Sequence, residues 1–420
     1  MNNAAQHLQV ANGNTTYDVE RIRSDFPILY REVNDKPLVY LDSAASAQKP
    51  TSVIEAMDHA LRFEYANVHR GIYYLSNTVT QKYEDARETC RRFLKAREAD
   101  EIVFTKNATE AVNLVAHSWG MENIQEGDEI ILSIMEHHAN IVPWHFLRER
   151  KGAVLKWAPI DDSGAFLMEE FEHLITPRTK IIALTQMSNV LGTVVPIADI
   201  VKLARKHGIL VFVDAAQSAV HMDLDVQALD VDFLMFSGHK VYGPSGIGVL
   251  YGKKEHLDRM PPFLGGGAMI ESVTVDTVTY GPVPSRFEAG TPPIVEAIGL
   301  TAALNYMMQV GRHNIAAHEH DLTAYAHAQL EALNWLKIYG TTPDKGGMIS
   351  FVMDGLHAHD VSMIVDRSGV AIRAGHHCAN PLMDRYGVSA MCRASFGMYN
   401  TRKDIDMLVE ALKKAHDLFA

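Results

Sequence analysis

Two residues that follow predicted strands have the right types for chemistry on a heterocyclic cofactor. Asp214 comes directly after the apolar run 209–213, and Lys240 follows the apolar run 233–236. Because the carboxyl ends of parallel strands meet at one edge of a sheet, we expect the two side chains to lie close together. A carboxylate can keep a ring nitrogen protonated while a lysine forms a Schiff base, which is the chemistry that pyridoxal phosphate requires. For each residue alone, a capping aspartate and a solvated lysine remain the alternatives.

A further stretch could hold a phosphate group. Residues 105–111 (TKNATEA) are expected to open a helix that runs to about His117. A helix N-terminus offers free N–H groups and the positive end of its dipole, and the Thr109 hydroxyl lies beside them. Ser237 and His239, just before the lysine, would complete the phosphate site. An ordinary helix cap is the alternative for Thr109 and its neighbours.

Two more predicted strands end in polar residues. The run 129–134 is followed by the pair His137 and His138, and the run 180–185 is followed by Asn189. Four neighbouring strand ends would therefore present an acid, a lysine, a histidine pair and an amide to one region.

Cys378 is the candidate nucleophile. Arg373, His376 and His377 precede it in a glycine-containing loop. Nearby cationic groups favour the thiolate, which is the nucleophilic form of cysteine. A small buried apolar side chain is the alternative. Cys90, in an amphipathic run, and Cys392 are expected to be structural.

The elements that must position these groups alternate between apolar runs and amphipathic stretches. Strands are predicted at 129–134, 153–157, 180–185, 209–213, 233–236 and 247–251, with helices at 141–150 and 198–206. This alternation predicts an α/β fold with a mostly parallel sheet covered by helices on both faces.

The pattern changes after residues 281–284 (GPVP). A long helix is predicted at 294–310, and the chain beyond about residue 311 mixes helices with shorter strands such as 348–353. We therefore expect a polar N-terminal tail (1–24), a large cofactor-binding domain (25–300) and a smaller α+β domain (301–420) that carries the Cys378 loop. The N-terminal part of the large domain is expected to pack partly on the small domain.

The composition limits the kinds of partner that this protein is expected to bind. The 420 residues carry a formal net charge of −12, from 39 Lys and Arg against 51 Asp and Glu, without a basic run, so nucleic acid is not an expected partner. No apolar stretch reaches the roughly 18 residues of a membrane span, so no membrane association is expected. The start of the chain lacks the features of a secretory signal, and three cysteines suit a reducing compartment. We expect a cytoplasmic protein.

The 21 histidines raise the question of a metal. Candidate ligands are His137 with His138, His376 and His377 with Cys378, and the run 318–320. None of these groups has the spacing of a zinc motif, so no metal is expected. A scaffold for iron–sulfur assembly would need clustered cysteines, and the three cysteines here are dispersed.

Nine motifs occur in order along the chain: YLDSAASAQKP (40–50), NVHRG (67–71), TKNATEA (105–111), EHHANIVPW (136–144), SNVLGT (188–193), VDAAQS (213–218), SGHKVYGPSGIGVLYG (237–252), FEAGTP (287–292) and RAGHHCA (373–379). Together they resemble the cysteine desulfurases of the class-V aminotransferase group, specifically the SUF-type (group II, SufS-like) enzymes, over roughly residues 25–415. The resemblance implies fold type I of pyridoxal 5'-phosphate enzymes, with a seven-stranded sheet in the large domain.

The resemblance also implies a role for each matching residue. On the cofactor, Lys240 would be the point of attachment, Asp214 would pair with the ring nitrogen, Gln217 would contact the phenolic oxygen and His137 would stack on the ring. The phosphate would be held by Thr109, Ser237 and His239, and Thr291 would serve the phosphate site of a neighbouring subunit, which implies a homodimer. The substrate-binding residues would be Asn189, Arg393, Arg373 and His69.

The implied reaction converts L-cysteine to L-alanine. Lys240 would remove the Cα proton, Cys378 would attack the substrate sulfur and keep it as a persulfide, and His137 is the first candidate for moving protons. A sulfur-acceptor protein of the SufE type is the expected partner, in iron–sulfur cluster assembly. A selenocysteine lyase is the alternative, because the same lysine, aspartate and cysteine would serve it.

Overall fold

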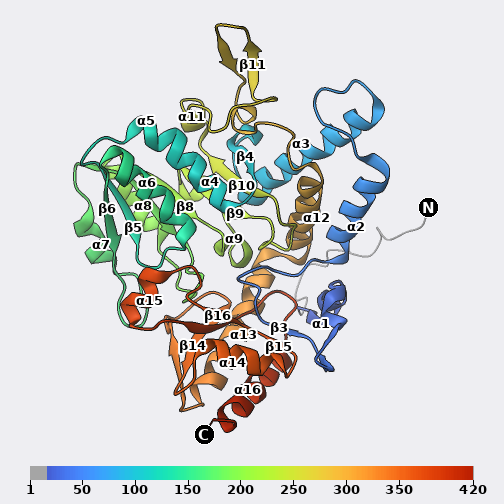
Figure 1. The fold of residues 1–420 in the computed structure, drawn as a ribbon, viewed down its shortest axis with the longest axis vertical. Coiled ribbons are helices and arrows are strands. Elements are labelled where there is room, and N and C mark those ends of the chain that lie inside the picture. Colours follow the sequence, from blue (N-terminus) through green and yellow to red (C-terminus); the bar gives the residue numbers. More distant parts are fainter. Residues whose placement is uncertain (1–16, 420) are drawn as a thin grey trace.

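A seven-stranded sheet forms the centre of the larger part of the molecule (Figure 1). The structure is a computed structural model and describes residues 17–419. In spatial order the strands are β4 (Ile102–Thr105), β10 (Gly248–Gly252), β9 (Phe233–Ser237), β8 (Leu210–Asp214), β7 (Thr179–Thr185), β5 (Glu129–Ser133) and β6 (Val154–Ala158). Strand β10 pairs antiparallel with both β4 and β9, and all other pairs in this sheet are parallel. The predicted α/β fold with a mostly parallel sheet is confirmed.

Helices cover both faces of this sheet, which is why its inner strands are apolar along their whole length. On one face, Ile130 and Leu132 pack with α4 (Ala108–Val115) and α6 (Val142–Lys151). On the other face, Ile131 packs in the core that includes α3 (Tyr74–Leu94), α8 (Ile197–Lys206) and α12 (Ile294–Val310). Successive residues of β5 thus point to opposite cores, as the strand period of two requires.

A second, antiparallel sheet lies in the C-terminal part of the chain. Its order is β13 (Leu336–Tyr339), β14 (Met348–Met353), β17 (Met391–Ser395) and β16 (Arg373–Gly375). Three helices share its core: α13 (Arg312–Glu331), α14 (Ala358–Asp366) and α16 (Arg402–Asp417). The helix predicted at 294–310 is α12, with the same bounds; it packs beside α3 and leads into α13 (Figure 1).

The N-terminal segment differs from the predicted tail. Residues 1–16 lie outside the described part of the chain, but Val19–Ser24 form helix α1, in which Ile22 is buried. Asp18 begins this helix by accepting a hydrogen bond from the Arg21 N–H at 3.0 Å. After β1 (Glu32–Val33) and β2 (Lys36–Pro37), strand β3 (Val39–Tyr40) pairs in parallel with β15 (Val370–Ala371). The N-terminal segment therefore lies against the C-terminal part.

Two features project from the body around the large sheet: the connection between helices α2 (Thr51–His59) and α3, and the hairpin of β11 (Ile270–Val273) and β12 (Val278–Tyr280) (Figure 1). The shorter helices are α5 (Met121–Asn123), α7 (Met168–Leu174), α9 (Ser218–His221), α10 (Val226–Leu229), α11 (Lys254–Leu257) and α15 (Asn380–Tyr386).

Candidate active site

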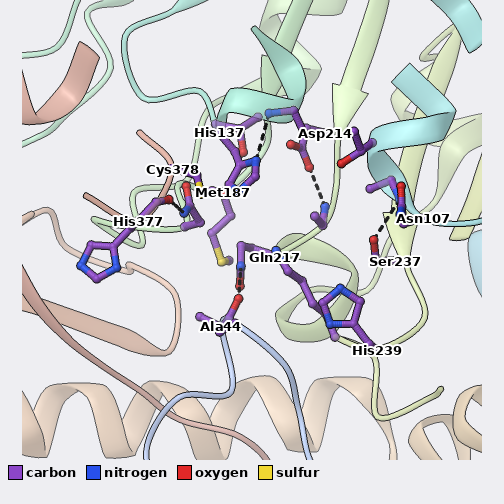
Figure 2. Close-up of a pocket in the computed structure, with 18 of the residues that line it drawn as sticks. Ala44, Asn107, His137, Met187, Asp214, Gln217, Ser237, His239, His377 and Cys378 are labelled. Atoms are coloured by element: carbon purple, nitrogen blue, oxygen red, sulfur yellow. Dashed lines mark hydrogen bonds between the residues drawn. The ribbon is translucent and has the colours of Figure 1, made fainter. Parts of the chain in front are cut away.

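A cavity of about 230 Å³ lies at the carboxyl ends of β5, β7, β8 and β9 (Figure 2). Its position is the one that the parallel topology predicts for a ligand site. The predicted site residues that line it are Thr109, His137, Asn189, Asp214, Gln217, Ser237, His239, Lys240, Arg373, Cys378 and Arg393.

Asp214 and Lys240 share the floor of this cavity. Asp214 is the last residue of β8, and its Oδ1 accepts a hydrogen bond from the Ala216 N–H at 2.8 Å (Figure 2). Burial raises the pKa of Asp214, while the Ala216 N–H and the Lys240 charge oppose that rise. Burial lowers the pKa of Lys240 to about 8 against the attraction of Asp214, so its amine loses a proton more easily than a surface lysine. The pair can therefore supply a nucleophilic amine beside a carboxylate.

His137 and Gln217 flank the same space. His137 lies between β5 and the short helix η5 (His138–Asn140), and its Nδ1 accepts the Ala139 N–H at 3.1 Å. Burial, followed by the charge of Lys240, lowers the pKa of His137 to about 3, so the ring is neutral. Gln217 donates from Nε2 to the carbonyl of Ala44 at 2.9 Å (Figure 2). Its buried Oε1 has no partner in the described part of the chain, which leaves that amide available to a ligand.

One end of the cavity can hold an anion. Helix α4 begins there, and the Ala108 N–H at its first turn donates to Ser237 Oγ at 2.9 Å (Figure 2). Thr109 and His239 line the same end, and burial lowers the pKa of His239 to about 4. Gly248 allows β10 to pass close to the start of α4, because a Cβ at this position would lie 2.5 Å from the carbonyl carbon of Asn107. A helix N-terminus with hydroxyl groups beside it is suited to a phosphate.

Arg393 also lines the cavity, from β17 of the second sheet. Its guanidinium is buried, and it donates to the Asn189 carbonyl at 2.7 Å and to Asp42 Oδ1 at 3.2 Å. Its Nε has no partner within residues 17–419. Arg373 also approaches Asp42, at 3.9 Å. The sequence alone assigned no role to Asp42, although the residue lies in the first of the nine motifs.

Cys378 lies in a four-residue connection between β16 and α15. Both His377 and Cys378 have left-handed backbone angles, with φ of 52° and 56°. Cys378 is half-buried at the edge of the cavity. Cys90 and Cys392 are fully buried, and burial raises the pKa of each thiol to about 12, in agreement with their expected structural role.

Two predicted site residues lie elsewhere in the chain. His69 and Thr291 line a separate cavity of about 380 Å³, and neither lines the central one. His69 Nε2 lies 2.8 Å from Glu84 Oε1. Other residues of the central cavity carried no predicted role, among them Asn107 and Met187 (Figure 2). Asn107 lies in the TKNATEA motif, which was a usable signal, whereas Met187 offered none.

Within the described residues, no three His, Cys, Asp or Glu side chains come together in a way that could hold a metal ion. The same residues form no helix with the length and apolar character needed to cross a membrane.

The sheet, the lysine–aspartate pair and the anion end define the fold type I class of pyridoxal phosphate enzymes. Comparison with known proteins is consistent with this class. Residues 39–408 match the family model of aminotransferase class-V. A cysteine desulfurase of Escherichia coli O127:H6 is 50% identical over 404 residues, covering 96% of this chain and 99% of that protein. A cysteine desulfurase of Salmonella agona is 51% identical with the same coverage.

Solved structures give the same result. The crystal structure of the cysteine desulfurase CsdA (S-sulfonic acid) from Escherichia coli superposes with a TM-score of 0.90 at 39% identity, covering 97% of this chain and all of that one. The apo cysteine desulfurase of Thermococcus onnurineus gives 0.90 at 38% identity, with 96% and 98% covered. The chain belongs to the class-V aminotransferase family, as one of its cysteine desulfurases.

The cofactor of this enzyme is pyridoxal 5'-phosphate, and the residues of the cavity fit it. The unpartnered Gln217 oxygen, the buried Asp214 carboxylate and the anion end match the polar groups around its ring and its phosphate. When bound, the cofactor supplies an electron sink that stabilises negative charge on the carbon next to it.

Proposed function

We propose that this enzyme is a SUF-type cysteine desulfurase that takes sulfur from L-cysteine onto Cys378 and releases L-alanine. The observation that carries the proposal is the position of Cys378, which lies at the edge of the cavity lined by Lys240 and Arg393. A nucleophile, a basic amine and a carboxylate-binding cation thus surround one space of about 230 Å³.

Binding begins at Arg393. Its buried guanidinium has an unpartnered Nε and a contact of 3.2 Å to Asp42, so the carboxylate of an amino acid can take up donors that are incompletely used. A planar guanidinium suits a carboxylate because it can donate two parallel hydrogen bonds. Asn189 supports this geometry through its carbonyl, which accepts from Arg393 at 2.7 Å.

Lys240 then moves the Cα proton. Its lowered pKa allows the free amine to exist near neutral pH, as a general base requires. His137, the first candidate for moving protons, has a pKa lowered to about 3 by burial, so its ring is neutral near physiological pH and holds no proton on Nδ1. We propose that His137 acts as a stacking surface and as a hydrogen-bond donor from Nε2.

The sulfur step takes place on this chain. The Cys378 thiolate attacks the Sγ atom of the substrate, a new S–S bond forms, and the substrate Cβ–S bond breaks. The electron pair of that bond stays with the carbon fragment, which takes up protons and leaves as alanine. The enzyme keeps one sulfur atom as a persulfide, and no external oxidant or reductant is needed.

The short Cys378 loop supports transfer to an acceptor protein of the SufE type. Only residues 376–379 separate β16 from α15, so the persulfide cannot travel far from the cavity. An acceptor must therefore approach the enzyme, and iron–sulfur cluster assembly is the proposed destination. A cytoplasmic location would provide the reducing conditions that suit three free cysteines.

A homodimer would explain why His69 and Thr291 lie outside the central cavity of their own chain. Large apolar side chains are exposed in the single chain within residues 61–74 and 273–280, close in sequence to the cavity residues 67–70 and 267–268, and such exposed apolar surface is typical of an interface. These side chains are Leu61, Phe63, Tyr65, Ile72, Tyr73, Tyr74, Val273, Val275, Val278 and Tyr280. We propose that both residues act on the partner's cavity, Thr291 at the phosphate and His69 at the substrate.

We also propose the division into a large domain (25–300) and a small domain (301–420). The second sheet packs with α13, α14 and α16 in a cluster of its own, although its residues Tyr339 and Met391 also join the core of the large sheet, and α12 leads from one part to the other.

The test is alanine formation from L-cysteine and from L-selenocysteine, by the wild type and by C378A, with and without a SufE-type acceptor. We expect cysteine turnover to depend on Cys378 and to increase with the acceptor. Cysteine turnover that is equal in C378A would refute the assignment of the nucleophile. Turnover of selenocysteine alone would identify the enzyme as a selenocysteine lyase.

A further inference from the structure

We infer that His138 and His376 are positioning residues that hold the Cys378 loop through acceptor nitrogens on their rings. The inference rests on the proposed function, since it concerns the residue proposed as the sulfur carrier. Neither histidine lines the central cavity, so both act on the reaction only through the loop.

Hydrogen bonds join the two histidines to the backbone at Cys378 and two residues after it. The Cys378 N–H donates to His376 Nδ1 at 3.1 Å, and the Cys378 carbonyl accepts the backbone N–H of His138 at 2.7 Å. Two residues later, the Asn380 N–H donates to His138 Nε2 at 3.1 Å. The two rings stack on each other, with centroids 5.8 Å apart and planes inclined by 29°. The histidines therefore form one unit that spans the loop.

The loop needs such support because its backbone is unfavourable. His377 and Cys378 are consecutive non-glycine residues in the left-handed region, with φ of 52° and 56°. Side chains crowd the backbone there, so the conformation persists only where the surroundings fix it. Asn189 Nδ2 holds the loop from the other side by donating to the His377 carbonyl at 2.8 Å.

The direction of these bonds defines the chemistry required. His376 must present an unprotonated Nδ1, and His138 an unprotonated Nε2, because each nitrogen accepts from a backbone N–H. Burial, followed by the charge of His376, lowers the pKa of His138, which favours the neutral ring. The side chain of His376 is exposed, so its position against the His138 ring does not result from burial in a hydrophobic core.

Asparagine and glutamine substitutions can test the acceptor atom apart from the aromatic ring, because their side-chain carbonyl oxygen accepts a hydrogen bond without a ring. An asparagine Oδ1 takes roughly the place of a histidine Nδ1, and a glutamine Oε1 that of Nε2. H376N and H138Q therefore keep the acceptor, whereas H376Q and H138N displace it. Each position thus supplies its own matched control, with the same functional group placed one bond further or nearer.

The experiment measures two properties of the four variants as holoenzymes: the rate at which iodoacetamide alkylates Cys378, and the rate of single-turnover persulfide formation with L-cysteine. In H376Q and H138N we expect both rates to change, with persulfide formation slower by about five- to tenfold, the effect of one lost hydrogen bond. In H376N and H138Q we expect both rates within about twofold of the wild type. The cofactor spectrum and KM should be unchanged in all four.

Equal behaviour of the two variants at each position would overturn the inference, because the acceptor atom would then be irrelevant. The alkylation rate reports the loop without requiring turnover. If the wild type formed no persulfide on Cys378, the proposed function would fail, and the alkylation comparison would still decide the positioning role.

Discussion

Arg393→Lys is the substitution that tests substrate binding most sharply. Arg393 is almost fully buried, and it donates to the Asn189 carbonyl at 2.7 Å and to Asp42 at 3.2 Å, with Nε unpartnered. Lysine keeps the positive charge but has one nitrogen and no planar fork. The ammonium cannot hold these protein contacts and also bind a carboxylate bidentately.

The size of the effect follows from this geometry. At least one charge-assisted hydrogen bond to the substrate carboxylate is lost, and such a bond contributes about 1.5–3 kcal/mol. Since about 1.4 kcal/mol corresponds to a factor of ten, kcat/KM should fall by about 10- to 150-fold. Most of the change should appear in KM, because the carboxylate contact exists both in the bound substrate and in the transition state.

The assay is steady-state alanine release over a range of L-cysteine concentrations. R402K is the matched control, because Arg402 pairs with Asp321 at an exposed position on α16. We expect R402K to behave as the wild type and the cofactor spectrum of R393K to be unchanged. A decrease in kcat/KM for R393K no larger than that of R402K would refute the role of Arg393.

Three further predictions concern attachment of the cofactor, stability and pH. K240A should fail to attach the cofactor covalently when borohydride reduction is followed by intact-mass analysis; attachment in K240A would contradict the assignment. E288A should destabilise the fold by about 3–5 kcal/mol in urea unfolding, since it leaves the buried Arg87, held at 2.7 and 2.9 Å, without its main partner; the exposed control E410A should lose less than about 1 kcal/mol. Burial raises the pKa of Glu136 from 4.5 to about 8. Between these two pH values the folded state holds a proton that the unfolded state has released, so the free energy of unfolding should fall as the pH rises from 4.5 to about 8. E136Q should flatten this fall, and an unchanged pH profile would contradict the argument.

Much of the large sheet could be predicted from the sequence, and the reason is physical. Strands buried on both faces must be apolar throughout, so β7, β8 and β9 stand out as short apolar runs. A parallel topology places the residues after each strand at one edge, so the proximity of Asp214 and Lys240 follows from the order of the strands alone. Helix α12 was equally clear, because a long apolar segment follows the turn 290–293 (GTPP) and ends at Gly311.

Other features could not be predicted because they depend on contacts distant in sequence. Asp42 and Arg393 are 351 positions apart and meet only when the chain that follows β3 runs beside β17. The neutral state of His137 is set by its burial, which no local pattern reveals. At the N-terminus, the polar composition concealed a short helix whose capping residue, Asp18, was present in the sequence.

The central claim is that Cys378 receives the sulfur atom. The most direct measurement is the mass of the proteolytic peptide that carries Cys378, taken after a single turnover of the holoenzyme with L-cysteine in the presence of an alkylating agent. The account predicts that this peptide gains one sulfur atom in the wild type and that the peptides of Cys90 and Cys392 do not. Alanine release in the same sample without added sulfur on Cys378 would contradict it.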